Sequence, residues 1–316
     1  MLFHIANRIG VPGTPGIITP LVNMGNVAVD VFLLLSGYCV YESWKKDPSI
    51  KRFYFKRFLR ILVPYLIFSI PLYLWKNVVE VKTFNLNAII GDVSTYNFWV
   101  HGMQTTWYVC AILLFYLLIP ILGLLMKKNK LCGIIVLIAI YVLNQVLWMV
   151  LPSYSVTSIA WTRLPVFALG VFLSCHGDII KVKKPKVVKY ALVLLAVLFT
   201  MIFPYREWYR NVFGNKPEYL WTGYILLAPG LLIILFEIVM RLPGFVNKGL
   251  ELIGSVSLEI YIIHVFALRV LDHYKLQTVL NAWYFVIVPV VTIGIAMAYH
   301  FIKTLIKHGI KRTATV

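Results

Sequence analysis

Six ionisable side chains lie inside or beside long apolar stretches of this 316-residue sequence, and they are its strongest candidates for chemistry. They are His4, Asp30, Arg163, Glu259, His264 and Arg269. An ionisable group at the centre of a bilayer costs about 2.5–3.5 kcal/mol on insertion scales, so such groups are functional-site candidates by default. An imidazole can take up a proton near neutral pH, which makes the two histidines candidates for acid–base work.

Some buried charges have a structural explanation instead. Glu42 and Glu237 lie near the ends of apolar stretches, where they can pair with neighbouring lysines and arginines. Arg163 and Arg269 can extend their charge toward the membrane interface. His4, Asp30, Glu259 and His264 lack such an explanation unless they pair with one another. A functional role and a structural role therefore both stay open for these four residues.

Membrane-spanning helices are the elements predicted to position these residues. The chain is 60% hydrophobic and 13% charged, with a mean hydropathy of +0.83. Thr105–Met126 and Leu131–Val150 contain no charged residue, and a bilayer core needs roughly 20 apolar residues per helix. The sequence therefore predicts an all-α polytopic membrane protein. Its nine full spans are expected at 27–43, 58–75, 105–126, 131–150, 159–175, 189–204, 219–240, 252–271 and 283–302.

The loop charges predict the orientation. Of the 30 lysines and arginines, 21 fall in every second connection and in the C-terminal tail, and 7 fall in the opposite set of loops. Because cytoplasmic loops carry the excess of basic residues, the C-terminus is predicted to be cytoplasmic. Several of the six ionisable residues then lie toward the outer half, which indicates a polar cavity open on that side.

Several function classes are disfavoured. The net charge of +18 is divided among short loops, so it predicts membrane topology and no nucleic-acid partner. The sequence has no H-E-x-x-H metal motif, no G-x-S-x-G nucleophile elbow and no phosphate-binding glycine loop, so no metal is expected. We expect one integral membrane domain over residues 1–316, with no soluble extra domain.

Five segments share motifs with a known family. They are LFHI at 2–5, GNVAVDVFLLLSGYCV at 25–40, FYFKRFLRILVPY at 53–65, TTWYVCAILLFYLLIPIL at 105–122, and RLPVFALGVFL at 163–173 together with IGSVSLEIYIIH at 253–264. In this order the segments resemble the membrane-bound acyltransferase-3 family, whose members O-acylate bacterial cell-surface glycans. That family has ten spans, so the resemblance implies a truncated first helix ending near His4. An arginine expected about ten residues before that histidine is missing, which suggests an internal start or a truncated chain.

The resemblance also implies roles for individual residues. Catalysis would use His4 as the base, Asp30 to orient it, and Arg163, Tyr261 and His264 to stabilise the oxyanion. Donor binding would use Lys56, Arg57, Arg60 and Trp107, although the three basic residues also fit ordinary anchoring on the cytoplasmic side.

The implied function is a membrane O-acyltransferase, foremost an O-acetyltransferase, in the inner membrane. Acetyl-CoA or another acyl-CoA is expected as the donor substrate, with no bound cofactor. The acceptor would be a cell-envelope or exopolysaccharide sugar, or a lipid-linked sugar, and membrane lipids surround the protein. A transporter or flippase for a lipid-linked or polar substrate is the alternative, and a structural membrane subunit is a third reading that the buried charges disfavour.

Overall fold

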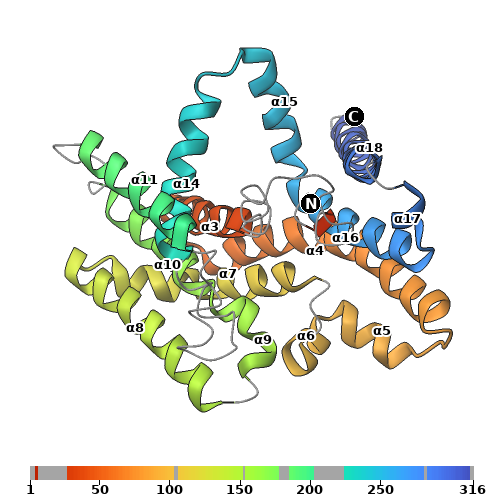
Figure 1. Cartoon of the computed structure of the whole chain (residues 1–316), viewed down its shortest axis with the longest axis horizontal. Helices are drawn as coiled ribbons and strands as arrows, with labels where there is room; N and C mark the ends of the chain where they lie inside the picture. The colour runs from red at the N-terminus through yellow and green to blue at the C-terminus, as the bar shows by residue number, and fades with distance from the viewer. Residues whose placement is uncertain are drawn as a thin grey trace. The chain divides into compact units, whose positions relative to one another are not determined.

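The structure is a computed structural model, and it describes residues 4–5, 27–102, 106–151, 154–177, 185–202, 224–280 and 283–313. Every regular element in these ranges is helical (Figure 1). The elements are α3 (Val27–Lys46), α4 (Ile50–Trp75), the π-helix η1 (Lys76–Glu80), α5 (Leu86–Val93), α6 (Tyr96–His101), α7 (Trp107–Met126), α8 (Lys130–Val150), α9 (Tyr154–Trp161), α10 (Leu164–Cys175), α11 (Pro185–Ile202), α14 (Tyr224–Val239), α15 (Gly244–Ser255), α16 (Ser257–His273), α17 (Leu276–Leu280) and α18 (Tyr284–Thr313).

The predicted all-α membrane architecture is confirmed, and every predicted span falls on a helix or a pair of helices. Within the described ranges, six helices are long and apolar enough to cross a membrane, and a bent pair would make a seventh. The count of nine full spans stays a prediction, because α14 is shorter than these helices and α11 is not among them.

Three boundaries differ from the sequence prediction. The stretch 159–175 is interrupted at Thr162 and Arg163, between α9 and α10. The stretch 252–271 belongs to two helices, α15 and α16, which bend by 68° at Val256. The predicted loop 76–104 contains η1, α5 and α6, which are too short for a periodicity argument to find.

The chain divides into two compact units. Unit 1 contains 1–14, 61–93 and 242–316, and unit 2 contains 15–60 and 94–241. Both units are assembled from segments distant in sequence, and α4 contributes residues to each. The prediction of a single domain over 1–316 stays a prediction.

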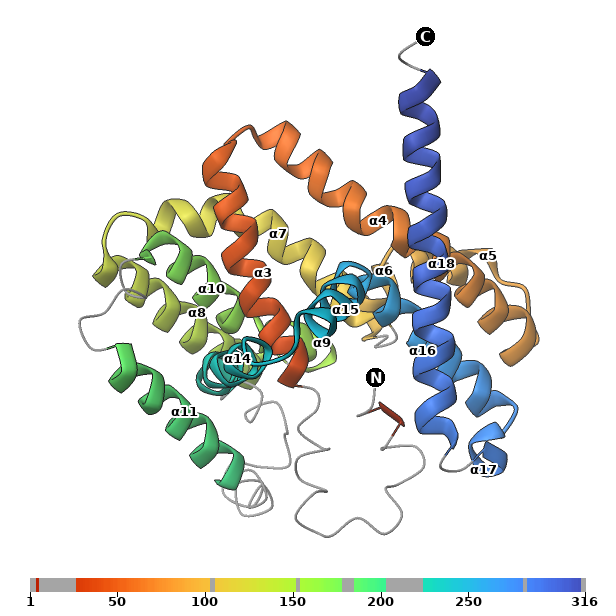
Figure 2. The same cartoon turned by 90° about the horizontal axis from the view of Figure 1, so that it is seen from above.

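Unit 2 is organised by the packing of α3 against α10, which run side by side in both views (Figures 1 and 2). A Cβ atom at Gly37 would clash with the carbonyl oxygen of Phe167, and one at Gly170 would clash with that of Leu34. Each glycine therefore lets its helix touch the backbone of the other. Lipid supplies little hydrophobic drive for helix association, so close backbone approach at small residues is the usual source of stability in membranes.

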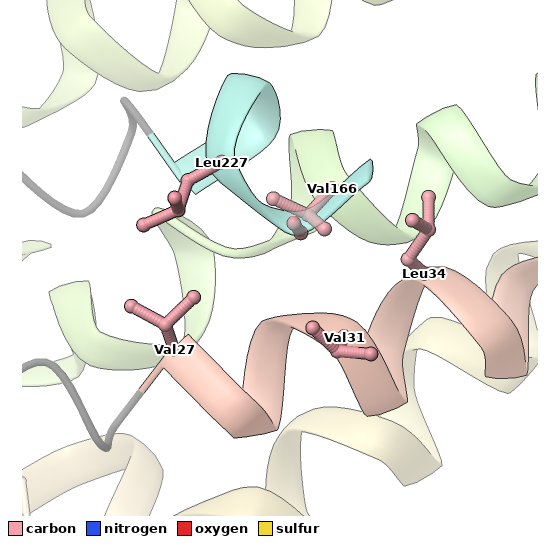
Figure 3. Packing of buried hydrophobic residues seen from close by; sticks show 6 residues of the cluster. Val27, Val31, Leu34, Val166 and Leu227 are labelled. Carbon is pink, nitrogen blue, oxygen red and sulfur yellow. The ribbon is translucent and has the colours of Figure 1, made fainter. Parts of the chain in front are cut away.

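A buried apolar cluster extends this contact to α14. Val27, Val31 and Leu34 of α3 face Val166 of α10 and Leu227 of α14 (Figure 3). The α7 helix joins the same core because Phe115 lies against Phe167, with ring centroids 5.2 Å apart. Residues from α3, α7 and α10 are thereby held in fixed register.

Unit 1 is built around α16 and α18. Two buried clusters join them: Leu268 with Tyr284 and Val288, and Ile263 with Ala296. The short described segment at residues 4–5 is part of this unit, since Ile5 is fully buried in the first cluster. His4, the residue before Ile5, therefore lies against α16.

We predict that Gly170→Ala destabilises the protein by about 1–3 kcal/mol or more, because the new methyl group must displace the α3 backbone. The matched control is Gly294→Ala in α18, where a Cβ atom would meet open space. Thermal unfolding of the purified variants in detergent is the measurement. Equal midpoints for the two variants would contradict the proposed packing of α3 on α10.

Candidate functional site

A pair of imidazole rings lies inside unit 1. His4 and His264 have ring centroids 5.5 Å apart, tilted by 34°. His264 is 3% exposed, and Tyr261 lies one turn before it with its ring edge-on at 5.6 Å. Three of the predicted catalytic residues are thus brought together by α16 and the segment at residues 4–5.

The hydrogen bonds of His264 indicate which ring nitrogen carries the proton. Its Nδ1 lies 3.1 Å from the carbonyl oxygen of Ile260. A carbonyl oxygen only accepts, so Nδ1 is the protonated nitrogen of the neutral ring and Nε2 carries a lone pair. The buried Nε2 has no hydrogen-bond partner among the described residues. Neutral His264 therefore offers an acceptor beside His4, and this suits orientation of an imidazole better than donation to an oxyanion.

A buried ion pair lies inside unit 2. The Nε of Arg163 is 3.7 Å from Oδ2 of Asp30, and the two side chains are 2% and 0% exposed. The guanidinium also lies over the ring of Trp107, 4.9 Å from its centroid, and donates to the carbonyl oxygen of Ile159 at 2.8 Å. Both carboxylate oxygens of Asp30 lack a hydrogen-bond partner in the described part of the chain. The carboxylate is therefore charge-paired but still able to accept hydrogen bonds.

The local sequence explains why Arg163 is available for this pair. α9 ends at Trp161, and α10 begins at Leu164 with Pro165 in its first turn, where a missing N–H is tolerated. Arg163 is the N-cap residue between them. The interruption places a guanidinium beside the start of a helix, within the stretch Val156–Cys175 that is long and apolar enough to be one membrane span.

The remaining predicted residues lie on α4 and α7. Lys56 and Arg60 are exposed on α4, and Arg57 is half-buried. Trp107, which is predicted among the donor-binding residues, contacts Arg163, and its role in donor binding stays a prediction. The predicted contact between His4 and Asp30 joins residues of the two units, and it stays a prediction.

Glu42 and Glu237 pair with neighbouring basic residues, as the sequence predicts. Glu42 pairs with Lys45 at 2.6 Å and also accepts from Ser174, and Glu237 pairs with Arg241 at 3.4 Å. These contacts support the interfacial pairing predicted for both.

Sequence reasoning missed two ion pairs of unit 1. Arg269 makes a two-point contact with Glu80 of η1, at 2.6 and 2.9 Å, so its charge is paired and does not simply reach outward. Lys76 pairs with Asp92 at 2.8 Å. Glu80 and Asp92 lie in the stretch 76–104 that was predicted to be a loop. Glu80 belongs to a π-helix, an element that is rare and often lies near functional sites. Among the described residues, no three His, Cys, Asp or Glu side chains are grouped as metal ligands.

We predict that Arg163→Met costs about 3–5 kcal/mol of stability, because it leaves the Asp30 carboxylate buried without a counter-charge. Adding Asp30→Asn to that variant recovers part of the loss. Chemical denaturation of the single and double variants measures the coupling. A double variant whose loss equals the sum of both single losses would show that the pair is not coupled. Arg241→Met, which breaks an exposed pair with Glu237, is the control and should change little.

The chain matches a family model over most of its length. A model described as an acyltransferase domain matches residues 1–301 of the 316 residues. No curated protein and no solved structure matches the chain. The family match covers all of the motif segments and both parts of the candidate site. This multi-pass membrane protein therefore belongs to the acyltransferase-3 family and is an acyltransferase.

Proposed function

We propose that the protein is an O-acyltransferase that moves a short acyl group, foremost acetyl, from acyl-CoA to a sugar hydroxyl. The acceptor is a cell-envelope or exopolysaccharide sugar, or its lipid-linked precursor. The protein lies in the inner membrane with its C-terminus in the cytoplasm, as the loop charges predict. The observation that supports this proposal best is the pair of imidazoles, His4 and His264, inside a membrane acyltransferase.

The reaction needs one base that later returns its proton. In our proposal the neutral imidazole of His4 takes the proton of the sugar hydroxyl while the oxygen attacks the thioester carbonyl carbon. The tetrahedral intermediate then collapses and breaks the C–S bond. The imidazolium of His4 gives its proton to the departing sulfur, so an O-acyl sugar and free coenzyme A are formed.

The other residues serve the charges that develop during this step. His264 offers its Nε2 lone pair to orient the His4 ring, and this replaces the oxyanion role that the resemblance implies. Asp30 has unfilled acceptor positions, which supports its proposed role in stabilising the imidazolium. Arg163 and Tyr261 remain the proposed stabilisers of the oxyanion.

The donor is proposed to enter from the cytoplasmic side, at the first turns of α4. Lys56, Arg57 and Arg60 lie 6 to 10 residues after its start at Ile50, which is about 9–15 Å along the helix. A guanidinium binds phosphate by two parallel hydrogen bonds, so Arg57 and Arg60 are the proposed ligands of the coenzyme A phosphates.

We predict that His4→Gln lowers the rate of acyl transfer by about 10²- to 10⁴-fold, because the general base is lost. Transfer of radiolabelled acetyl groups to envelope glycan in membranes is the measurement. The variant should retain the thermal unfolding midpoint of the unchanged protein. A His101→Gln variant, which changes an exposed histidine of α6, is the control and should retain full activity. Near-normal transfer by the His4 variant would remove His4 from its assigned role.

We also predict that inverted membrane vesicles, which expose the cytoplasmic face, bind coenzyme A, and that sealed right-side-out vesicles do not. The double variant Arg57→Ala/Arg60→Ala should lose at least about tenfold in affinity, since hydrogen bonds to charged groups contribute about 1.5–3 kcal/mol each. Arg52→Ala, which removes an exposed arginine paired with Asp47, is the control. Binding from the outer face, or binding insensitive to the double variant, would contradict the proposed donor entry.

A further inference from the structure

A widened helical turn in unit 1 brings charged and aromatic side chains together at one end of α16. The π-helix η1 continues α4, and the N–H of Val81 donates to the carbonyl oxygen of Lys76, five residues before it, at 2.9 Å. The buried amide of Asn77 donates to the carbonyl oxygen of Tyr73 at 3.0 Å and holds this turn to α4. Because π-turns are rare and frequently lie at functional sites, the side chains around η1 are candidates for binding a ligand.

The first of these side chains form an ion pair between η1 and α16. The Nε and Nη2 atoms of Arg269 donate to the two carboxylate oxygens of Glu80 at 2.6 and 2.9 Å. The side chains of Arg269 and Glu80 are 27% and 33% exposed, so a ligand can reach both. A carboxylate accepts at about four positions in all, more than a two-point contact uses. Glu80 can therefore accept from hydroxyl groups while it stays paired.

An aromatic ring lies next to the ion pair. Trp75 is the last residue of α4, and its ring meets the rings of Phe266 and His273 edge-on, with centroids 5.9 and 5.4 Å apart. Phe266 and His273 flank Arg269 on one side of α16, three residues before it and four after it. Neither of these two contacts is a parallel stack, and Trp75 is half-buried. The indole is therefore held in a fixed plane and stays partly accessible.

The charges around η1 are balanced, which favours a neutral ligand. Arg269 is paired with Glu80, and Lys76 is paired with Asp92 at 2.8 Å. A phosphate or an acidic sugar would instead be favoured by an excess of positive charge. An uncharged sugar ring fits the groups that are present. Its C–H faces pack on an aromatic ring, and the hydroxyls at its edge hydrogen-bond to a carboxylate and a guanidinium.

We propose that Trp75, Glu80 and Arg269 form an acceptor subsite, which binds an uncharged sugar unit of the glycan or of its lipid-linked precursor. This inference rests on the proposed function. The loop charges predict that 76–104 and the end of the span 252–271 lie on the outer side of the membrane. Arg269 follows His264 by five residues, about 7.5 Å along α16, and lies on another face of the helix. The acceptor subsite therefore holds a sugar unit beside the one that is acylated.

The test separates binding of the acceptor from binding of the donor. Purified protein in detergent transfers radiolabelled acetyl groups from acetyl-CoA to two acceptor preparations. One is envelope polysaccharide freed of its esters by mild alkali, and the other is lipid-linked sugar extracted from the same membranes. The variants are Trp75→Leu, Trp75→Phe and Glu80→Ala, in which the partly exposed Arg269 can be solvated. The control is Trp283→Leu, which removes a 68% exposed tryptophan of the same unit.

We expect Glu80→Ala to raise the KM for the acceptor about tenfold or more, because hydrogen bonds to a charged group are lost. Trp75→Leu should raise it by roughly 2- to 12-fold, the range for one aromatic contact, and Trp75→Phe should recover part of that loss. The value of kcat, the KM for acetyl-CoA and the thermal unfolding midpoint should not change, since only binding of the acceptor is weakened. Trp283→Leu should leave all four quantities unchanged.

An acceptor KM that neither Trp75→Leu nor Glu80→Ala changes would overturn the acceptor subsite. An equal rise in the KM for acetyl-CoA would do the same, as would a fall in kcat and in the unfolding midpoint at an unchanged acceptor KM, the result expected of a purely structural ion pair. Transfer to either preparation supports a sugar acceptor, and the preparation that is acetylated identifies its source. If the unchanged protein acetylated neither preparation, the proposed function itself would be wrong.

Discussion

The contact between α3 and α10 is the constraint on which unit 2 depends. Gly37 and Gly170 let each helix place its backbone against the other, so the separation of these helices is set by main-chain atoms and not by adaptable side chains. A helix pair fixed in this way cannot slide by a fraction of a turn without a clash. Because Asp30 lies on α3 and Arg163 is the N-cap residue of α10, the same contact fixes the distance between the two buried charges.

Both units bury ionisable side chains in an apolar interior, and they compensate for the buried groups in different ways. In unit 2, a carboxylate is neutralised by a guanidinium that is itself spread over the Trp107 ring. In unit 1, two imidazole rings lie side by side, and the pair carries no charge while both rings are neutral. A low-dielectric interior tolerates both arrangements because neither leaves an isolated net charge. The proposed reaction uses the second arrangement for proton transfer and the first for stabilising charge.

Much of this architecture follows from the sequence, because lipid imposes a simple rule on length and hydropathy. The charge-free stretches that became α7 and α8 are clear from composition alone. Interruptions are harder to predict: Val256 lies between Ser255 and Ser257, Thr162 precedes Arg163, and none of these residues by itself ends a helix. Among the site residues, His264 and Arg163 were identifiable as charges in apolar runs. Glu80 was not, because its partner Arg269 lies 189 residues away and no local pattern connects them.

The bend at Val256 also bears on how the chain enters the membrane during synthesis. α15 and α16 contain 12 and 17 residues, about 18 and 26 Å, so each is shorter than the roughly 30 Å hydrocarbon core. α16 also carries Glu259, His264 and Arg269, which weaken its own preference for lipid. Its buried apolar residues pack on α18, which the ribosome makes later. Contacts with α18 therefore complete the burial of α16, so the position of His264 is fixed only after α18 has been synthesised.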